Sequence, residues 1–518
     1  MNEEIAEYYE ELYRLYIDEN QPLERRYRQL RESLERVVRE RIQGNSLQTT
    51  DLAARINYVA TQYELDIKEQ NQLHTFRLTS NDILNHRKFP AKEEFLRDLR
   101  AVAFAYRKMF AQDIPLKLFS VLPKQEITSL GKKEKKEYIR RIRVCFDYAD
   151  DTYLYVHPVD IIADEPIRVV YNKPGINHEF EETIKELWRY AQLNLLDVFV
   201  DREGIYTPSF IVLEPDYLID ISSLAECYKD YGSHPANYFL SRLVPIDNAR
   251  PLLLGNIANL FLDEWIHAGE EEPDYIDCMK KAFRQYPIEL AACAELRDPS
   301  KEKEFAKDCR MHFEHIRDIV QHTFLEPGYN LDKKDAVLEP SYICEALGIQ
   351  GRLDYMQRDM SSFIEMKSGK ADEFSIQGKV EPKENNKVQM LLYMAVLEYS
   401  MGQDRRRMHP YLLYTRYPLL YPARASWAQV RRVINLRNRI VAAEYGVQFH
   451  NHSDFTRNLL AQINPEVMNE RKLRGRFWEQ YLKPSISRFR EKLSALEPLE
   501  QAYFYTLYNF ITQELYTS

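Results

Sequence analysis

The 518-residue chain lacks the long apolar segments and leader sequences that mark membrane and secreted proteins. Its longest apolar run, MLLYMAVLEY from Met390, is much shorter than the roughly 20 residues that cross a bilayer. The N-terminal stretch MNEEIAEYYEELY is acidic and amphipathic, unlike a secretory signal. We therefore expect a cytoplasmic protein that makes no membrane contact.

Paired cysteines and a nucleotide-binding loop are also missing. None of the six cysteines forms a CxxC pair, and in a chain without a secretion signal such cysteines are expected to be reduced thiols. The pattern G-x-x-x-x-G-K-[ST] does not occur, because SGKADE and SLGKKEK lack the first glycine at the required distance. The chain itself is therefore not expected to hydrolyse nucleoside triphosphates.

A surface that is basic everywhere is excluded by the formal net charge of −9, although local basic grooves remain compatible with it. The clusters DRRRMHP near Arg405 and RKLRGRF near Arg471 could contact phosphates, but such clusters are more often solvated faces. Trp427 and Trp478 nearby could offer stacking surfaces.

The spacing of apolar residues divides the chain into four predicted regions. Residues 1–125 have helical spacing, and residues 126–220 form a β-rich, barrel-like domain that a helix over 179–199 interrupts. Residues 221–440 mix helices and strands as in an α/β core, and residues 441–518 return to helix. A content of 45% hydrophobic and 29% charged residues is typical of a soluble globular protein.

Charged residues interrupt two strand-like stretches, GRLDYM and FIEMK, which we expect to form a hairpin connected by QRDMSS. Residues two apart point the same way in a strand, so Glu365 and Lys367 share a face. Asp354 can face them from the neighbouring strand. Two carboxylates bind Mg²⁺ or Mn²⁺ through oxygen, and the Met366 carbonyl is a further candidate ligand.

Such a site suits metal-assisted hydrolysis of phosphodiesters, because the ion acidifies a water and a lysine orients it or offsets negative charge. A second signal follows in the predicted helix VQMLLYMAVL, where Gln389 and Tyr393 stand four apart on one face. A buried polar pair needs partners, which a bound phosphate or Lys367 would supply. An isolated ExK would indicate a surface salt bridge, but the whole constellation is much rarer.

Cys309, His312 and His315 recur at three-residue steps and could form a zinc site. A fourth ligand is missing, so an ordinary helix face is the favoured interpretation.

The motifs GRLD, IEMKSGK and QMLLY resemble those of the PD-(D/E)xK nucleases of the RecB-like branch. The nearest likeness is to the nuclease half of the eukaryotic-type DNA replication and repair helicase-nucleases, over roughly residues 140–518. It implies a restriction-endonuclease-like core, a mixed sheet flanked by helices, at 221–440. It also implies an OB-like domain at 126–220, with 441–518 leading toward a helicase that follows the chain or is a separate subunit. The N-terminal helical region, 1–125, is an addition that the resemblance does not cover.

The resemblance also assigns roles to residues. Asp354 and Glu365 would be metal ligands, Lys367 the catalytic lysine, and Gln389 and Tyr393 the motif that follows. The implied cofactor is Mg²⁺ or Mn²⁺, and the implied substrate is single-stranded DNA, including ends and flaps.

Two departures from this family stand out. Asn259, in GNIAN, occupies the usual position of a histidine ligand; its oxygen can bind Mg²⁺ weakly, and Glu264 is a candidate substitute. Many relatives hold an iron–sulfur cluster with one cysteine before the motifs and three after. Cys227 could be the first, but no cysteine follows Cys344, so we expect no cluster.

Two functions follow from these observations. The first is a metal-dependent deoxyribonuclease, the nuclease part of a helicase-nuclease in DNA repair, replication or anti-phage defence. The alternative, motivated by Asn259, is a catalytically weak or inactive nuclease-fold module that binds DNA or a partner protein.

Overall fold

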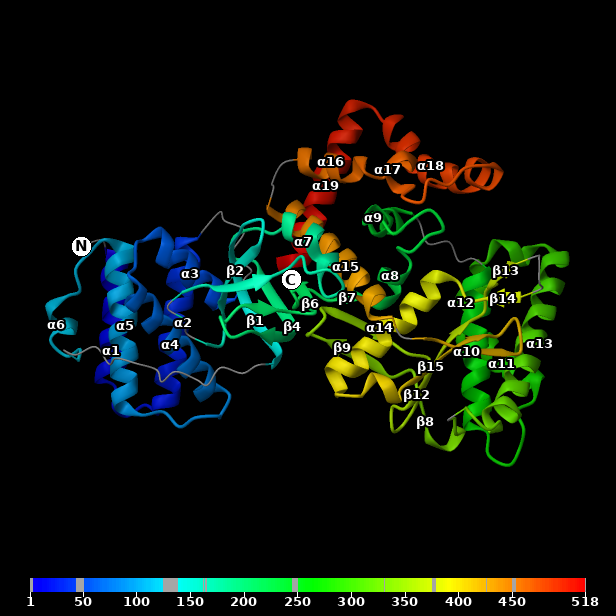
Figure 1. The fold of residues 1–518 in the computed structure, drawn as a ribbon, viewed down its shortest axis with the longest axis horizontal. Helices are drawn as coiled ribbons and strands as arrows, with labels where there is room; N and C mark the ends of the chain where they lie inside the picture. Colours follow the sequence, from blue (N-terminus) through cyan, green and yellow to red (C-terminus); the bar gives the residue numbers. More distant parts are fainter. Residues whose placement is uncertain are drawn as a thin grey trace. The chain divides into compact units, whose positions relative to one another are not determined.

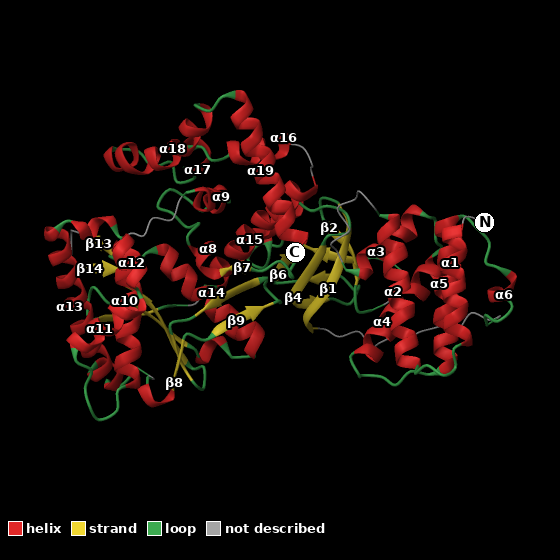
Figure 2. Cartoon of the chain, turned by 180° about the vertical axis from the view of Figure 1, so that it is seen from behind, coloured by secondary structure: helices red, strands yellow, loops and turns green. Residues whose placement is uncertain are grey.

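The computed structural model describes residues 3–42, 51–123, 138–161, 163, 165–244, 250–329, 331–374, 379–424, 426–449 and 453–517. The chain divides into two compact units. The N-terminal unit comprises Met1–Glu214, Val441–His452 and Thr506–Ser518, and the central unit comprises Pro215–Ile440 and Ser453–Tyr505. Helices and several sheets occur along the chain (Figure 1, Figure 2), so the protein is of the mixed α/β class.

The described residues up to 123 are helical. They form α1 (Glu3–Ile17), α2 (Leu23–Arg41), α3 (Leu52–Gln62), α4 (Ile67–Leu84), α5 (Lys92–Phe110) and α6 (Leu116–Phe119). Apolar residues at steps of three and four turn inward to a common core. Asp66 caps α4, and with Glu69 it makes a capping box that fixes where this helix begins.

A β-barrel follows in the same unit. Its strands are β1 (Tyr138–Ala149), β2 (Tyr153–Pro158), β3 (Ile167–Val170), β4 (Gln192–Val200), β5 (Tyr206–Thr207) and β6 (Phe210–Leu213). The order β1-β2-β3-β5-β4, with a further β1–β4 pairing, closes five strands into a ring. β3 and β5 pair in parallel, and α7 (Glu181–Lys185) lies between β3 and β4 in sequence.

The helix predicted over 179–199 is wrong in its second half, which forms β4. A short apolar run such as QLNLLDVFV suits a buried strand as well as a helix. Pairing with β1 on one side and β6 on the other decides in favour of the strand.

The central unit contains a five-stranded sheet ordered β16-β15-β12-β11-β8. Its strands are β8 (Ala336–Leu338), β11 (Tyr355–Gln357), β12 (Ser362–Lys367), β15 (His409–Tyr414) and β16 (Leu419–Pro422). β12 and β15 are parallel, and α14 (Glu384–Met401) lies between them in sequence. A three-stranded sheet of β7 (Ile219–Asp220), β10 (Ile349–Arg352) and β9 (Ser341–Cys344), and the pair β13 (Asp372–Phe374) and β14 (Lys379–Glu381), complete its strands among the described residues.

Helices cover both faces of the five-stranded sheet. Apolar residues of α10 (Arg250–His267) and α13 (Pro299–Gln321) share a core with Ile364 and Met366 of β12. Side chains alternate along a strand, so Glu365 and Lys367 point to the opposite face, where they contact α14. The unit's other helices are α8 (Ile221–Ala225), α9 (Ala236–Leu243), α11 (Tyr275–Gln285), α12 (Pro287–Ala292), α16 (Ser453–Ala461), α17 (Pro465–Met468) and α18 (Lys483–Ser494), whereas α15 (Trp427–Phe449) and α19 (Pro498–Thr517) continue into the N-terminal unit.

The predicted hairpin of two motif strands is present, since β11 pairs antiparallel with β12. GRLDYM is not one strand, however. Gly351 and Arg352 belong to β10, and Tyr355 begins β11 in the other sheet. The chain changes sheets at Leu353 and Asp354, because Gly351 and Arg352 pair with β9, whereas Tyr355 and Met356 pair with β12 and β8. Asp354 therefore lies at a bend, at the end of the ladder with β12.

Gly348, in the turn between β9 and β10, closes over a buried arginine. Its φ is +63°, and a Cβ there would lie 2.6 Å from Cζ of Arg437. Arg437 is fully buried and donates hydrogen bonds to the carbonyls of Gly348 and Tyr217. Glycine is therefore required at this position for two reasons, the left-handed backbone conformation and the close approach of the Arg437 guanidinium.

Gly348→Ala is expected to lower the free energy of unfolding by about 2–4 kcal/mol, because the methyl group overlaps a guanidinium with no room to retreat. Urea unfolding followed by tryptophan fluorescence measures the change. Gly402→Ala is the matched control, with a φ of +71° and no neighbour within 4 Å. It should cost only the left-handed strain, about 1 kcal/mol. Equal losses in the two variants would contradict the overlap argument.

No helix among the described residues is long and apolar enough to cross a membrane.

Candidate active site

Strand β12 places Glu365 and Lys367 side by side. Nζ of Lys367 lies 2.9 Å from Oε1 of Glu365. Glu365 is only 4% exposed, whereas the Lys367 side chain is about one quarter exposed (26%). The pair is therefore a partly buried ion pair rather than the surface salt bridge that an isolated ExK indicates.

Gln389 of α14 completes a triangle with this pair. Its Nε2 donates to Oε1 of Glu365 at 2.6 Å, and its Oε1 accepts from Nζ of Lys367 at 2.8 Å. Oε1 of Glu365 thus has two donors, while Oε2 is buried without a partner among the described residues. An unpaired buried carboxylate oxygen is costly, and a cation would satisfy it.

Asp354 reaches the same place from the bend between the sheets. Its Oδ2 accepts a hydrogen bond from the backbone N–H of Met366 at 2.6 Å. The N–H and C=O of a strand residue point to the same side, so the Met366 carbonyl also lies toward Asp354. The sequence prediction that Asp354 faces Glu365 is consistent with this contact.

Tyr393 of α14 contacts the bend that carries Asp354, and burial, followed by the charge of Glu365, raises the pKa of its hydroxyl. Its hydroxyl donates to the carbonyl of Arg352 at 2.5 Å, and its side chain is buried. A Cβ on Gly351 would lie 3.1 Å from the Tyr393 ring, so the glycine of GRLD makes room for the tyrosine. These contacts make Tyr393 a residue that positions the bend carrying Asp354.

The pKa values of both carboxyl groups at the site are raised. Burial, followed by the charge of Asp354, raises the pKa of Glu365 to about 8, although Lys367 opposes this shift. Burial also raises the pKa of Asp354, against the Met366 hydrogen bond. Burial lowers the pKa of Lys367, but Glu365, Asp354 and Glu226 together outweigh it and the net shift is upward. Lys367 therefore stays an ammonium ion, while the two carboxyl groups beside it favour holding protons, or another positive charge in their place.

The candidate ligands for a cation at this site are thus two carboxylates and a backbone carbonyl. Among the described residues, no group of three or more His, Cys, Asp or Glu side chains is arranged to hold a metal ion. Mg²⁺ keeps several waters and is often held by only one or two carboxylates, so it fits a site of this kind.

Asn259 lies on the face of α10 that approaches the end of β12. A Cβ on Gly255 would lie 3.3 Å from Oγ of Ser368, which places this helix beside the residue that follows Lys367. Gly255, Asn259 and Asp263 stand at four-residue steps and share that face. Asn259 is half-buried, and no hydrogen bond joins it to Asp354 or Glu365 in the described part of the chain.

The sequence analysis missed Asp263, one turn after Asn259. Burial, together with the charges of Glu339 and Asp354, raises the pKa of Asp263 to about 6. Glu264, the candidate substitute, is offset from the face that Gly255, Asn259 and Asp263 share, and it makes an ion pair with Lys281 of α11 at 2.5 Å. The missed signal was the helical repeat of four that continues from Gly255 through Asn259 to Asp263.

Asp263→Asn is expected to weaken metal binding about tenfold, because it removes a negative charge that acts on Asp354. Titration with Mn²⁺, followed by the electron paramagnetic resonance signal of the free ion, measures the affinity. Glu264→Gln, the adjacent residue on the same helix, should leave it unchanged. Equal affinities of wild type and Asp263→Asn would show that Asp263 has no influence on the ion.

The alternative zinc site on α13 is not formed. Nδ1 of His315 bonds to the carbonyl of Thr415 at 2.9 Å, and His312 is fully buried without a hydrogen bond among the described residues. Burial lowers the pKa of His312 to about 4, so its ring is neutral. Cys309 is a buried thiol in the core that α13 shares with α10.

The two tryptophans near the basic clusters have different surroundings. Arg405 lies over the ring of Trp427, 4.5 Å from its centroid. Trp478 is buried, edge-on to Tyr231, so the prediction of a stacking surface at Trp478 is wrong.

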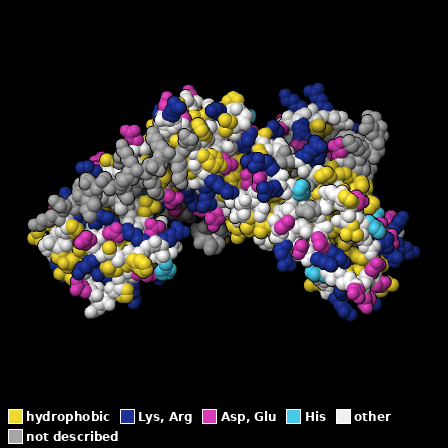
Figure 3. All heavy atoms as spheres, turned by 60° about the horizontal axis from the view of Figure 1, so that its bottom comes forward, with side chains coloured by type: hydrophobic (Ala, Val, Ile, Leu, Met, Phe, Trp, Pro, Cys, Tyr) yellow, Lys and Arg dark blue, Asp and Glu magenta, His cyan; other side chains and the backbone are white. Residues whose placement is uncertain are grey.

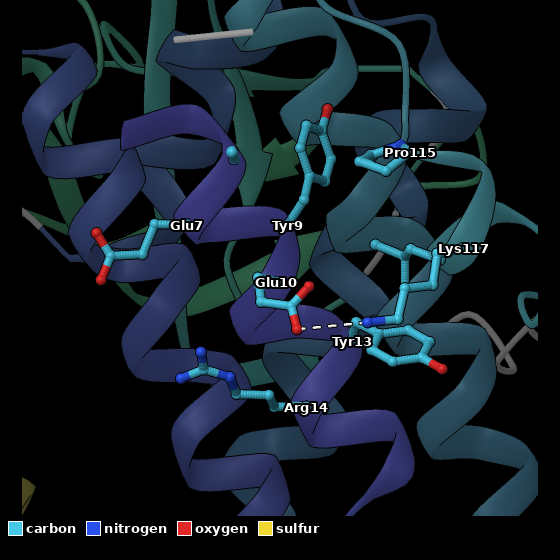
Figure 4. A pocket seen from close by; sticks show the side chains of 9 residues that line it. Glu7, Tyr9, Glu10, Tyr13, Arg14, Pro115 and Lys117 are labelled. Carbon is cyan, nitrogen blue, oxygen red and sulfur yellow. Dashed lines mark ion pairs between the residues drawn. The ribbon is translucent and has the colours of Figure 1, made fainter. Parts of the chain in front are cut away.

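A recess of about 470 Å³ between α1 and the start of α6 lies in the N-terminal unit (Figure 4). Lys117 pairs with Glu10 at 3.5 Å there and lies 4.1 Å from the ring centroid of Tyr13. None of the candidate catalytic residues lines this recess.

No protein-family model matches the chain, and no curated protein sequence matches it.

Proposed function

We propose that the chain is a metal-dependent deoxyribonuclease that hydrolyses phosphodiester bonds of single-stranded DNA, including ends and flaps. The observation that carries this proposal is the buried Oε2 of Glu365, which has no partner among the described residues, in a carboxyl group that the charge of Asp354 acts on. A buried acceptor in a field of negative charge favours a divalent cation. A lysine fixed beside it suits stabilisation of a phosphate that gains negative charge.

In this proposal Asp354, Glu365 and the Met366 carbonyl hold Mg²⁺ or Mn²⁺, with Asn259 as a weak further donor. The bound ion would supply Lewis-acid stabilisation of the phosphate and a more acidic water. Lys367 places its ammonium group beside the phosphate oxygens, and Gln389 fixes its direction. Tyr393 holds the bend that carries Asp354.

The fold of the central unit supports a PD-(D/E)xK core, because a β-hairpin carries the acidic motif and a helix joins its second strand to a parallel neighbour. The barrel supports an OB-like domain. Five strands close in the order β1-β2-β3-β5-β4, β3 and β5 are parallel, and a short helix separates β3 from β4. Such domains bind single strands. We further propose that the protein acts in the cytoplasm with a helicase domain or subunit.

Cleavage of end-labelled single-stranded, flap and duplex DNA tests the proposal. With Mg²⁺ or Mn²⁺ we expect products from single strands and flaps, and with EDTA none. Binding without products under either metal would overturn the nuclease. It would favour the inactive module instead, and Asn259→His would then be the first reversion to examine.

A further inference from the structure

The segment between α17 and α18 is locally basic in an acidic chain. Residues 471–483, RKLRGRFWEQYLK, carry five basic side chains and one acidic side chain, whereas the whole chain has a net charge of −9. Basic and acidic side chains are interspersed over the face drawn in Figure 3. The strong excess of positive charge in residues 471–483 distinguishes this segment from that mixed surface.

The same segment presents two aromatic rings to solvent. Phe477 is 58% exposed and Tyr481 is 64% exposed, and their ring centroids are 5.9 Å apart with planes inclined by 34°. Phe477 immediately precedes the π-helical turn Trp478–Leu482 and Tyr481 lies within it, and this rare conformation is frequent at functional sites. Trp478 points inward against Tyr231 and anchors the turn. One aromatic residue thus holds the turn while two face outward.

Contacts within the central unit fix this segment beside the helix of the candidate site. Arg471 donates its backbone N–H to the Tyr231 carbonyl at 3.1 Å, and its guanidinium pairs with Glu384, the first residue of α14. Gln389 follows Glu384 by five residues, roughly 7.5 Å along a helix. Arg471, where the basic aromatic segment begins, therefore lies within a few nucleotides' length of the triangle formed by Glu365, Lys367 and Gln389.

We propose that residues 471–483 bind the single-stranded DNA substrate, with bases stacked on Phe477 and Tyr481 and phosphates held by Lys472, Arg474 and Arg476. This inference rests on the proposed nuclease function and names the surface that guides the strand. Lys472 and Arg474 are exposed and have no ion-pair partner among the described residues. Two adjacent exposed rings suit successive unpaired bases, which every single strand offers and a duplex hides.

Fluorescence anisotropy of the full chain in EDTA tests the proposal without cleavage. The probes are labelled oligothymidine, an abasic strand of the same length, and a duplex. Phe477→Ala with Tyr481→Ala is expected to weaken oligothymidine binding at least tenfold, because stacking is lost, while abasic binding stays within twofold. Tyr503→Ala, an equally exposed tyrosine (67%) on α19, is the control and should leave both affinities unchanged.

Lys472→Gln with Arg474→Gln should weaken binding of both strands and lower the slope of log K against log salt by about 1.4, the value for two lost phosphate contacts on a single strand. Arg488→Gln with Arg490→Gln, exposed basic residues of α18, is the control that should leave the slope unchanged. Circular dichroism establishes that each variant is folded.

Wild-type affinity in both segment variants would overturn this inference, and metal-dependent cleavage by the same proteins would leave the nuclease standing. Loss of oligothymidine binding in the aromatic variant, in a protein that never cleaves DNA, would support the surface and contradict the nuclease. A changed oligomeric state in light scattering, with DNA affinity unaltered, would identify a protein contact and overturn the inference.

Discussion

Glu365→Gln is expected to reduce the rate of metal-dependent DNA cleavage by at least about 100- to 1,000-fold while leaving the protein folded. The substitution keeps the size of the side chain and an oxygen for the donors Lys367 and Gln389. It removes the negative charge and the unpartnered oxygen, which are the two properties that a divalent cation needs. Initial rates on end-labelled single strands at saturating Mg²⁺ measure the effect.

The matched control for this prediction is Glu264→Gln. Glu264 is also a glutamate in an ion pair with lysine, but its partner is Lys281 on the surface of α11. This variant should cleave at the wild-type rate. If Glu365→Gln cleaves as fast as Glu264→Gln, the carboxylate is not a ligand of a required ion, and the function proposed from it is wrong.

Sequence spacing was sufficient for the parts of the site that lie on one regular element. Glu365 and Lys367 are two apart on a strand, and Gln389 and Tyr393 are four apart on a helix, so local periodicity places each pair on one face. The sequence analysis predicted that Gln389 contacts either a bound phosphate or Lys367. The hydrogen bond of 2.8 Å from Nζ of Lys367 to Oε1 of Gln389 confirms the second of these partners.

Local spacing does not reveal how elements that are distant in sequence pair and pack with one another. The bend at Asp354 depends on two different sheets pairing with the two halves of GRLDYM, and this pairing is decided by residues far away in sequence. Asp263 was missed for the same reason, because its relation to Asp354 depends on how α10 packs on the sheet. Strand β4 was taken for helix because a buried apolar run has no period to distinguish the two.

The second large effect concerns pH and metal together. In EDTA, the stability of the wild-type protein relative to Glu365→Gln should fall as the pH rises from about 4.5 to about 8. Glu365 has a pKa of about 8 when folded, against an ordinary value of 4.5, so between these values the folded protein holds a proton that the unfolded chain has lost. Stability therefore decreases with rising pH throughout this window and is constant above it. The raised pKa of Asp354 acts in the same direction.

Mg²⁺ should reverse this loss, since an ion in the site replaces the protons as the positive charge between the carboxylates. The stabilisation by saturating Mg²⁺ is expected to increase from pH 5 to pH 8 in wild type and to be nearly absent in Glu365→Gln. Urea unfolding followed by tryptophan fluorescence reports on it, because Trp265, Trp427 and Trp478 lie in the central unit. Each unit of pKa difference amounts to about 1.4 kcal/mol, so even a partial shift is measurable. A stabilisation by Mg²⁺ that is independent of pH and equal in both proteins would place the ion elsewhere, whereas growth confined to wild type ties the ion, the proton and the carboxylate to one site.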